Sequence, residues 1–579
     1  MCIRDRVWLA WDFYLERICY QDSASYILEM IRKEWFMTVH SRFGAIFSQI
    51  IPLILLKFKA PLKVVLIGYS INFVILYAAC FWFARSVCQH RAAAYTICFL
   101  LVFSVKSTFF WPVTELLQGV IFSAVFFAWW NSKRHRNAYL HYIVAFLICL
   151  LALMTHPLTC AVLELVVFYD FLDQSERPIK QRLLRLGIGI VPALFILKGF
   201  SSPYEQAQVP SLDQARKLLA IFEELPGTSR LFELLAEEFS VLFLALGLLV
   251  LILAFKKKWL KLCLALAFNL AFFVLIAITY PYGATVLAYE NTFYPMVMCQ
   301  TLLISHELLI PYSRFKLPQI SLFILTLLFL FNIYGHSRVY QTKTEHFQAI
   351  ANSLEGSTER KIVFSSFNYP HQISMMSWPS SAESLLFSSL EGPDKSFTFY
   401  IAQEDEYDLI RGIQPADELL LEYPWSLKGS QYRLPKHYFN LPAKPYSFVN
   451  GSNELSGDSV LTLLSHTKMK WVNRCSDFRA STKPYFRLRF ENSAADPIPS
   501  TRMSDNSVFI AYRFFFNGEL VDWQPPKTTL LMDIRSQMEQ LVLVEIPEQK
   551  EDIEIQFGLV GYNGYKMYLT SPKYPIRIR

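Results

Sequence analysis

The sequence predicts a polytopic α-helical membrane domain, followed by a water-soluble part that combines an α/β segment with a β-sandwich. Up to about residue 335 the apolar runs are long and nearly uncharged, as membrane-spanning helices require. Beyond that point charged residues, Pro, Ser and Asn return, and no run is long enough to cross a bilayer. From about residue 430 the apolar residues alternate in short runs that are separated by turn residues, a pattern typical of β-sandwiches.

The membrane domain, which we assign to residues 1–335, should contain about 10–12 helices, taking about 20 mostly apolar residues for each crossing. The opening MCIRDR resembles translated sequencing-adapter text. We therefore expect residues 1–6 to be artefactual and 7–10 to be the tail of a truncated first helix. The other candidate segments are 64–84, 92–105, 117–130, 141–154, 158–172, 183–200, 238–255, 262–280, 293–311 and 318–335.

Basic residues between the apolar segments predict the orientation, because cytoplasmic loops carry an excess of Lys and Arg. Segment 26–57 has too few consecutive apolar residues to cross the membrane. We therefore expect its helices to lie along the outer surface of the membrane or to enter it only part-way. The loops then alternate correctly, and the part after residue 335 is extracytoplasmic. The clusters assigned to the cytoplasm are Arg85 with Arg91, residues 133–136, residues 177–185, residues 256–261, and Arg314 with Lys316.

The formal charge of +7 does not indicate nucleic-acid binding, since the Lys and Arg residues are scattered or sit beside apolar runs. The chain has no CxxC pair and no Cys/His cluster with zinc-ligand spacing. Gly-rich phosphate loops, GxSxG and HExxH motifs are also absent from the sequence. Soluble-nucleotide and hydrolase functions therefore have no motif to support them.

Four ionisable residues fall in the predicted outer loops, each near a helix end. They are Asp22 in YQDSASY, Glu115 in FFWPVTELLQG, His156 in LMTHPLT and Glu290 in LAYENTFYP. Ionisable groups at membrane depth are costly and indicate function by default. The alternative for any one of them is an interfacial side chain that reaches water. Four on one face, each beside aromatic or Pro-containing sequence, favour a shared cavity.

This placement resembles the GT-C superfamily of membrane glycosyltransferases over residues 7–335. The resemblance rests on an aspartate in the first outer loop, surface helices after it, an acidic residue in the next outer loop, and a C-terminal extracytoplasmic domain. It implies a polyprenyl-phosphate-linked sugar donor, a glycan, lipid or protein acceptor, and a bacterial cytoplasmic membrane. Asp22 matches the catalytic first-loop acid, and Glu115 matches its companion. Ser23 follows Asp22 where many members carry a second acid, and no DxD lies near Glu115, so a paired acidic motif for a divalent metal is lacking.

Glycosyl transfer also needs a base at the acceptor hydroxyl and donors that hold the departing phosphate. We expect Asp22 to be the base, with Glu115 beside it. His156, Arg42 and Lys106 are the candidates for holding phosphate, and Glu290 is a candidate for lining the cavity.

The water-soluble part divides into an α/β segment at 336–430 and a β-rich, sandwich-like domain at 431–579. TEHFQAIANSL predicts a helix, and RKIVFSSF and SFTFYIA predict buried strands. FNGEL places Asn-Gly between apolar runs, which predicts a hairpin.

Two other functions remain open. A transporter or flippase for a lipid-linked glycan would use the β-rich domain for docking, although the internal repeats typical of transporters are not evident. A non-catalytic envelope assembly protein is the third.

Overall fold

In the computed structural model the chain forms two compact units. The first unit contains Met1–Ile18, Glu34–Ala60 and Val64–Ser337, and the second contains Cys19–Lys33, Pro61–Lys63 and Arg338–Arg579. The structure describes residues 2–103, 105–132, 138–174, 178–199, 212–355, 357–370, 373, 376–403, 406–411, 420–421, 434–449, 467–472, 477–478, 484–493, 498, 500, 508–520, 528–532, 534, 537–547, 553–561 and 567–578. The predicted basic clusters at 133–136 and 177 lie outside these ranges.

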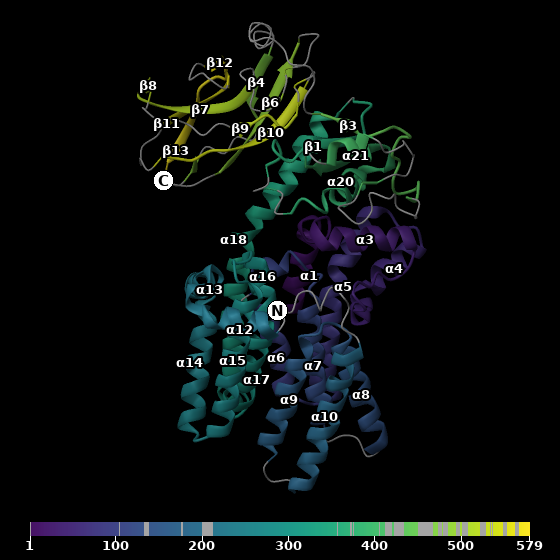
Figure 1. Cartoon of the computed structure of the whole chain (residues 1–579), viewed down its shortest axis with the longest axis vertical. Coiled ribbons are helices and arrows are strands. Elements are labelled where there is room, and N and C mark those ends of the chain that lie inside the picture. The colour runs from purple at the N-terminus through teal and green to yellow at the C-terminus, as the bar shows by residue number, and fades with distance from the viewer. Residues whose placement is uncertain are drawn as a thin grey trace. The chain divides into compact units, whose positions relative to one another are not determined.

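The first unit is helical, and most of its apolar helices begin and end within a few residues of the predicted segments, whereas α18 (Leu317–Ser353) runs well beyond residue 335. Helices α9, α10, α14 and α15 run lengthwise in it (Figure 1), with α9 packed on α10 and α14 packed on α15. Its longer helices are α1 (Cys2–Asp12), α5 (Leu62–Trp82), α6 (Arg91–Val102), α7 (Glu115–Trp130), α8 (Ala138–Leu153), α9 (Thr159–Asp173), α10 (Ile179–Gly199), α12 (Leu212–Ala220), α13 (Pro226–Glu237), α14 (Ser240–Phe255), α15 (Trp259–Thr279) and α17 (Tyr294–Ile304).

Shorter elements connect these helices in the described part of the first unit. Helix α18 (Leu317–Ser353) begins in the first unit and ends in the second. The connecting elements are α2 (Tyr14–Ile18), η1 (Phe43–Gln49), α4 (Ile50–Lys57), η2 (Phe83–Val87), η3 (Ser107–Phe109), η4 (Phe222–Glu224), α16 (Val286–Thr292), η5 (Ser305–Leu309) and η6 (Ser313–Phe315).

Among the described residues, three helices are long and apolar enough to cross a membrane, or four if one bent pair counts as a single span. The three are Leu62–Val87, Trp259–Thr279 and Leu317–Ser353, and the bent pair is α13 with α14, which meet at 79°. Helices α6, α7 and α8 are apolar but have only 12, 16 and 16 residues. That is less than the roughly 17–25 residues of an ordinary crossing helix.

The second unit contains mixed sheets and several helices. A parallel sheet with the order β2-β1-β3 is formed by β1 (Lys361–Ser365), β2 (Thr398–Ala402) and β3 (Ser447–Phe448). All residues of β1 and β2 are buried, as continuous apolar parallel strands require. The predicted strands and the helix before them are thus present. The helices of this unit are α3 (Gln21–Lys33), the end of α18, α20 (Ser380–Ser388) and α21 (Tyr407–Arg411), with the short η7 (Ser389–Glu391) and η8 (Pro393–Lys395).

Among its described residues, the second unit also contains two further sheets, which are mostly antiparallel (Figure 1). One has the order β10-β6-β4, and the other has the order β5-β13-β11-β7-β8, with β12 paired to β11 and β9 paired to β7. Aromatic side chains pack between the sheets: the rings of Phe486 and Phe557 lie 5.4 Å apart, as do those of Trp471 and Tyr574. The strands are β4 (Thr467–Trp471), β5 (Asp477–Phe478), β6 (Tyr485–Asn492), β7 (Val508–Phe516), β8 (Glu519–Leu520), β9 (Thr528–Thr529), β10 (Gln537–Leu543), β11 (Ile553–Gly561), β12 (Met567–Thr570) and β13 (Tyr574–Ile578).

Helix α3 differs from the expected membrane-surface helix. Its apolar face, which includes Ile27, Leu28 and Ile31, is buried, and α3 packs against α20 within the second unit. Protein therefore covers the face that we expected to contact lipid.

Candidate functional site

Three of the predicted site residues, Glu115, Arg42 and His156, gather in the first unit. Glu115 is the first residue of α7, where the amino-terminal end of the helix dipole stabilises a carboxylate. Arg42 Nη1 lies 3.1 Å from Glu115 Oε2, and both side chains are largely buried. The guanidinium thus neutralises a carboxylate that would be costly to bury alone.

Gly44 brings the segment that carries Arg42 against the connection between α8 and α9. The Gly44 N–H donates to Met154 O at 2.9 Å, and Gln118 Nε2 donates to Gly44 O at 2.6 Å. A Cβ at Gly44 would lie 2.0 Å from Thr155 Oγ1, so only glycine permits this approach. The same backbone contact brings Arg42 close to both Glu115 and His156.

His156 is half-buried beside this ion pair. Its Nδ1 accepts a hydrogen bond from the Leu158 N–H at 3.1 Å. Burial, together with the Arg42 guanidinium, holds the pKa of His156 well below its usual range. The imidazole is therefore neutral near pH 7 and carries its proton on Nε2.

This lowered pKa predicts a specific pH dependence of stability. Below about pH 6.5 the unfolded chain protonates His156 but the folded chain does not, so the free energy of unfolding falls as the pH drops. The slope due to one proton is at most about 1.4 kcal/mol per pH unit. His156→Asn, which keeps an acceptor for Leu158, should remove this component. Unfolding of both proteins by SDS titration between pH 8 and 5 would test it, and parallel stability curves would contradict it.

Glu290 and Lys106 form a second group in the first unit, which fixes the backbone turn at η3. The Glu290 carboxylate is 2% exposed and accepts hydrogen bonds from the N–H groups of Lys106 (2.8 Å), Ser107 (2.9 Å) and Thr108 (3.1 Å). It also accepts one from the Thr108 hydroxyl. Lys106 Nζ forms an ion pair with Glu238 Oε2 at 2.5 Å. These two predicted site residues are thus engaged in holding the turn.

A small hollow of about 30 Å³ lies beside the second group and reaches the residue that precedes Glu115. Thr108, which binds Glu290, and Thr114, which precedes Glu115, both line it. The guanidinium of Arg17 also lines it, donating from Nε to Ser70 Oγ at 2.8 Å and from Nη1 to Phe109 O. Burial and the nearby Arg6 lower the pKa of Arg17 to about 9. The hollow has room for one or two water molecules.

Sequence reasoning missed Arg17. The signal for it was a cation next to Glu16 in an otherwise apolar segment, five residues before Asp22. Asp22 itself belongs to the second unit, as the second residue of α3, where its side chain is half-buried. The structure therefore brings together Arg42, Glu115 and His156, and it brings Lys106 together with Glu290. The convergence of Asp22 with these groups stays a prediction.

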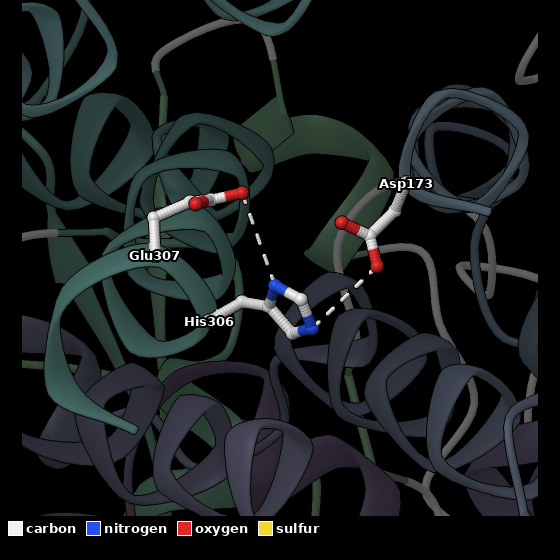
Figure 2. Close-up of side chains that lie close together, drawn as sticks. All are labelled: Asp173, His306 and Glu307. Atoms are coloured by element: carbon white, nitrogen blue, oxygen red, sulfur yellow. Dashed lines mark ion pairs between the residues drawn. The ribbon is translucent and has the colours of Figure 1, made fainter. Parts of the chain in front are cut away.

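Sequence reasoning also missed an ionic network that links α9, α14, α15 and η5 in the first unit. Figure 2 shows the His306 ring between two carboxylates, with Nε2 at 3.7 Å from Asp173 Oδ2 and Nδ1 at 3.9 Å from Glu307 Oε1. Each of the three residues offers one possible ligand atom, and these three atoms lie within 4.8 Å of one another. The residue types and their spacing therefore suit a metal site.

Lysine ammonium groups already neutralise these two carboxylates. Lys261 Nζ forms ion pairs with both Asp173 Oδ1 and Glu307 Oε1, the latter at 2.7 Å. Lys258 Nζ lies 2.6 Å from Glu307 Oε2, and Lys256 Nζ lies 3.7 Å from the same atom. Three ammonium groups face two carboxylates, so electrostatics favours an ion-pair cluster here over a divalent cation.

A larger pocket of about 490 Å³ opens beside this network. His90 is part of its wall and also caps α6, since its Nδ1 accepts a hydrogen bond from the Ala93 N–H at 3.2 Å. Burial lowers the pKa of His90 to about 4. The lining residues are Cys88, Gln89, His90, Phe127, Asn131, Asp173, Gln174 and His306.

Comparison with known proteins gives the chain no relative: no protein-family model, no curated protein and no solved structure matches it.

Proposed function

We propose that the chain is a membrane glycosyltransferase of the GT-C type, which moves a sugar from a polyprenyl-phosphate-linked donor to an acceptor on the outer face of a bacterial cytoplasmic membrane. The proposal includes a membrane domain of about 10–12 helices and an extracytoplasmic part with a sandwich-like β-domain. The observation that carries it is the group of Arg42, Glu115 and His156. These three residues come from segments far apart in the sequence, in a chain that also has helices long and apolar enough to cross a membrane.

The residues supply the groups that the reaction needs. Asp22 takes the proton from the acceptor hydroxyl, and the hydroxyl oxygen forms a bond to the anomeric carbon of the sugar. The bond from that carbon to the phosphate oxygen breaks, and its electron pair leaves with the polyprenyl phosphate. Arg42 and the Nε2–H of His156 are donors for the oxygen that gains this charge. Glu115 holds the Arg42 guanidinium in place.

The test is transfer by the purified full-length chain in lipid vesicles. The donors are decaprenyl phosphates that carry one radiolabelled hexose or pentose each, with total membrane glycolipid as the acceptor. The expected result is a labelled acceptor and an equal amount of free decaprenyl phosphate, with loss of transfer in Glu115→Gln. Arms with Mg²⁺ and with EDTA would show whether a divalent metal takes part.

Glu233→Gln is the matched control. Glu233 is half-exposed on α13, and its ion pair with Arg230 is a surface pair that contributes little to stability. The variant should transfer sugar like the wild type. Movement of intact labelled donor between the leaflets, without a new glycosidic bond, would replace the proposal by a transporter or flippase. Binding of envelope glycans with neither activity would indicate an assembly protein.

A further inference from the structure

Helix α3, which carries Asp22, belongs to the second unit, not to the helical first unit. Cys19–Lys33 groups with Arg338–Arg579. The Tyr20 hydroxyl donates to Thr344 Oγ1 at 2.8 Å, and its ring meets that of Phe347 edge-on at 5.6 Å. Both partners lie on the final turns of α18. The proposed base is therefore held by α20 and by the carboxy-terminal turns of α18, which belong to the second unit.

A buried ion pair contacts the first residue of α3. Glu383 on α20 and Lys343 on α18 each have side chains that are 1% exposed, with Lys343 Nζ at 2.7 Å from Glu383 Oε1. The same carboxylate oxygen accepts the Gln21 N–H at 2.6 Å. The first N–H groups of a helix have no partner within it, so this carboxylate serves as an external cap for α3.

The backbone at Gln21 gives a second, independent indication. Its φ of +58° is left-handed, a conformation that residues other than glycine rarely adopt. Such a conformation persists where the surrounding structure enforces it, and it often marks a functional position. Here the bond to Glu383 fixes the N–H of Gln21, and Asp22 is the next residue along the chain.

We propose that Lys343 and Glu383 are positioning residues for Asp22: their ion pair locks the left-handed start of α3 and thereby sets where the Asp22 carboxylate points. The inference rests on the proposed function for its catalytic meaning, but the lock itself can be measured without any substrate. A buried ion pair contributes little to stability compared with an apolar pair of similar size. The Gln21 N–H that this pair binds gives it a role other than stability.

The decisive variant is the double change Lys343→Met with Glu383→Leu, which removes both charges and the acceptor but keeps an apolar, volume-matched core. Hydrogen–deuterium exchange of the full-length protein in nanodiscs would then be followed by mass spectrometry. Amides of residues 20–24 should exchange at least about 10-fold faster than in the wild type, while β7 and β11 stay unchanged. Arg338→Gln, at an exposed ion pair on the same helix, is the control and should change nothing.

Two further measurements separate positioning from general stability. Gln21→Gly, added to the double variant, makes the left-handed start of α3 acceptable without the lock and should restore part of the protection. In the transfer assay the double variant should lose kcat by about 10-fold or more, with KM for the donor unchanged, because the base is displaced while the donor site is intact.

Each outcome decides between the claims. Unchanged exchange at residues 20–24, or faster exchange spread over the whole second unit, would overturn the lock. Faster local exchange with full turnover would overturn the positioning role. The proposed function would be rejected if the wild-type protein transfers no sugar from any donor. Faster local exchange in the double variant would then still support the lock.

Discussion

Asparagine in place of Asp22 is expected to reduce sugar transfer by about 10²- to 10⁴-fold, the usual contribution of a general base. The amide has nearly the same shape as the carboxylate but cannot accept the proton of the acceptor hydroxyl. Asp22 is in the first turn of α3, where asparagine is also tolerated, so the fold should survive the change. The measurement is kcat and KM from the release of decaprenyl phosphate, with unfolding midpoints recorded in parallel.

The control for this change is Asp213→Asn. Asp213 is also an acid in the first turn of a helix, α12, and it is exposed. It should keep wild-type turnover. If Asp22→Asn retains turnover, Asp22 is not the base, and Glu115 would become the first alternative. A fall in KM together with kcat would instead indicate that Asp22 strains the bound donor.

Alanine in place of Glu290 is expected to cause the largest loss of stability, about 4–6 kcal/mol. The change leaves the three N–H groups of Lys106, Ser107 and Thr108 and one hydroxyl without their acceptor. Hydrogen bonds to a charged group contribute about 1.5–3 kcal/mol each, and water entering the space would recover part of that sum. SDS titration in mixed micelles would measure the free energy of unfolding.

Two variants frame this prediction. Glu290→Gln keeps one oxygen acceptor but turns an NH₂ group toward N–H donors, so an intermediate loss is expected. Glu233→Ala removes an exposed carboxylate and should stay within about 0.5 kcal/mol of the wild type. A Glu290→Ala protein as stable as the Glu233→Ala protein would show that the η3 turn does not depend on this carboxylate.

The parts of the fold that the sequence predicts well are those set by local pattern. The apolar runs coincide with helices, RKIVFSSF and SFTFYIA contain β1 and β2, and the FNGEL hairpin joins β7 to β8. In that hairpin Asn517 and Gly518 have φ of +49° and +87°, as a two-residue turn with Asn-Gly requires. Each of these signals lies within a few consecutive residues.

The parts that the sequence could not predict depend on partners far along the chain. The amphipathic pattern of α3 predicts that its apolar face is covered. The pattern does not distinguish a covering by lipid from a covering by another helix such as α20. The lysines at 256–261 match a cytoplasmic loop, and nothing local indicates that Glu307, about fifty residues later, lies among them. Glu290 is recognisable as a costly buried acid, but its partners are backbone N–H groups, which every residue type except proline supplies.

The close approach at Gly44 has a consequence for the tolerance of this chain to mutation. A single added methyl group would push residues 42–44 away from Thr155, and with them the guanidinium that faces Glu115. In a library that samples every amino acid at each position, Gly44 should therefore be as intolerant as a catalytic residue, although it has no functional group. Its half-exposed neighbour Phe43 should accept many replacements.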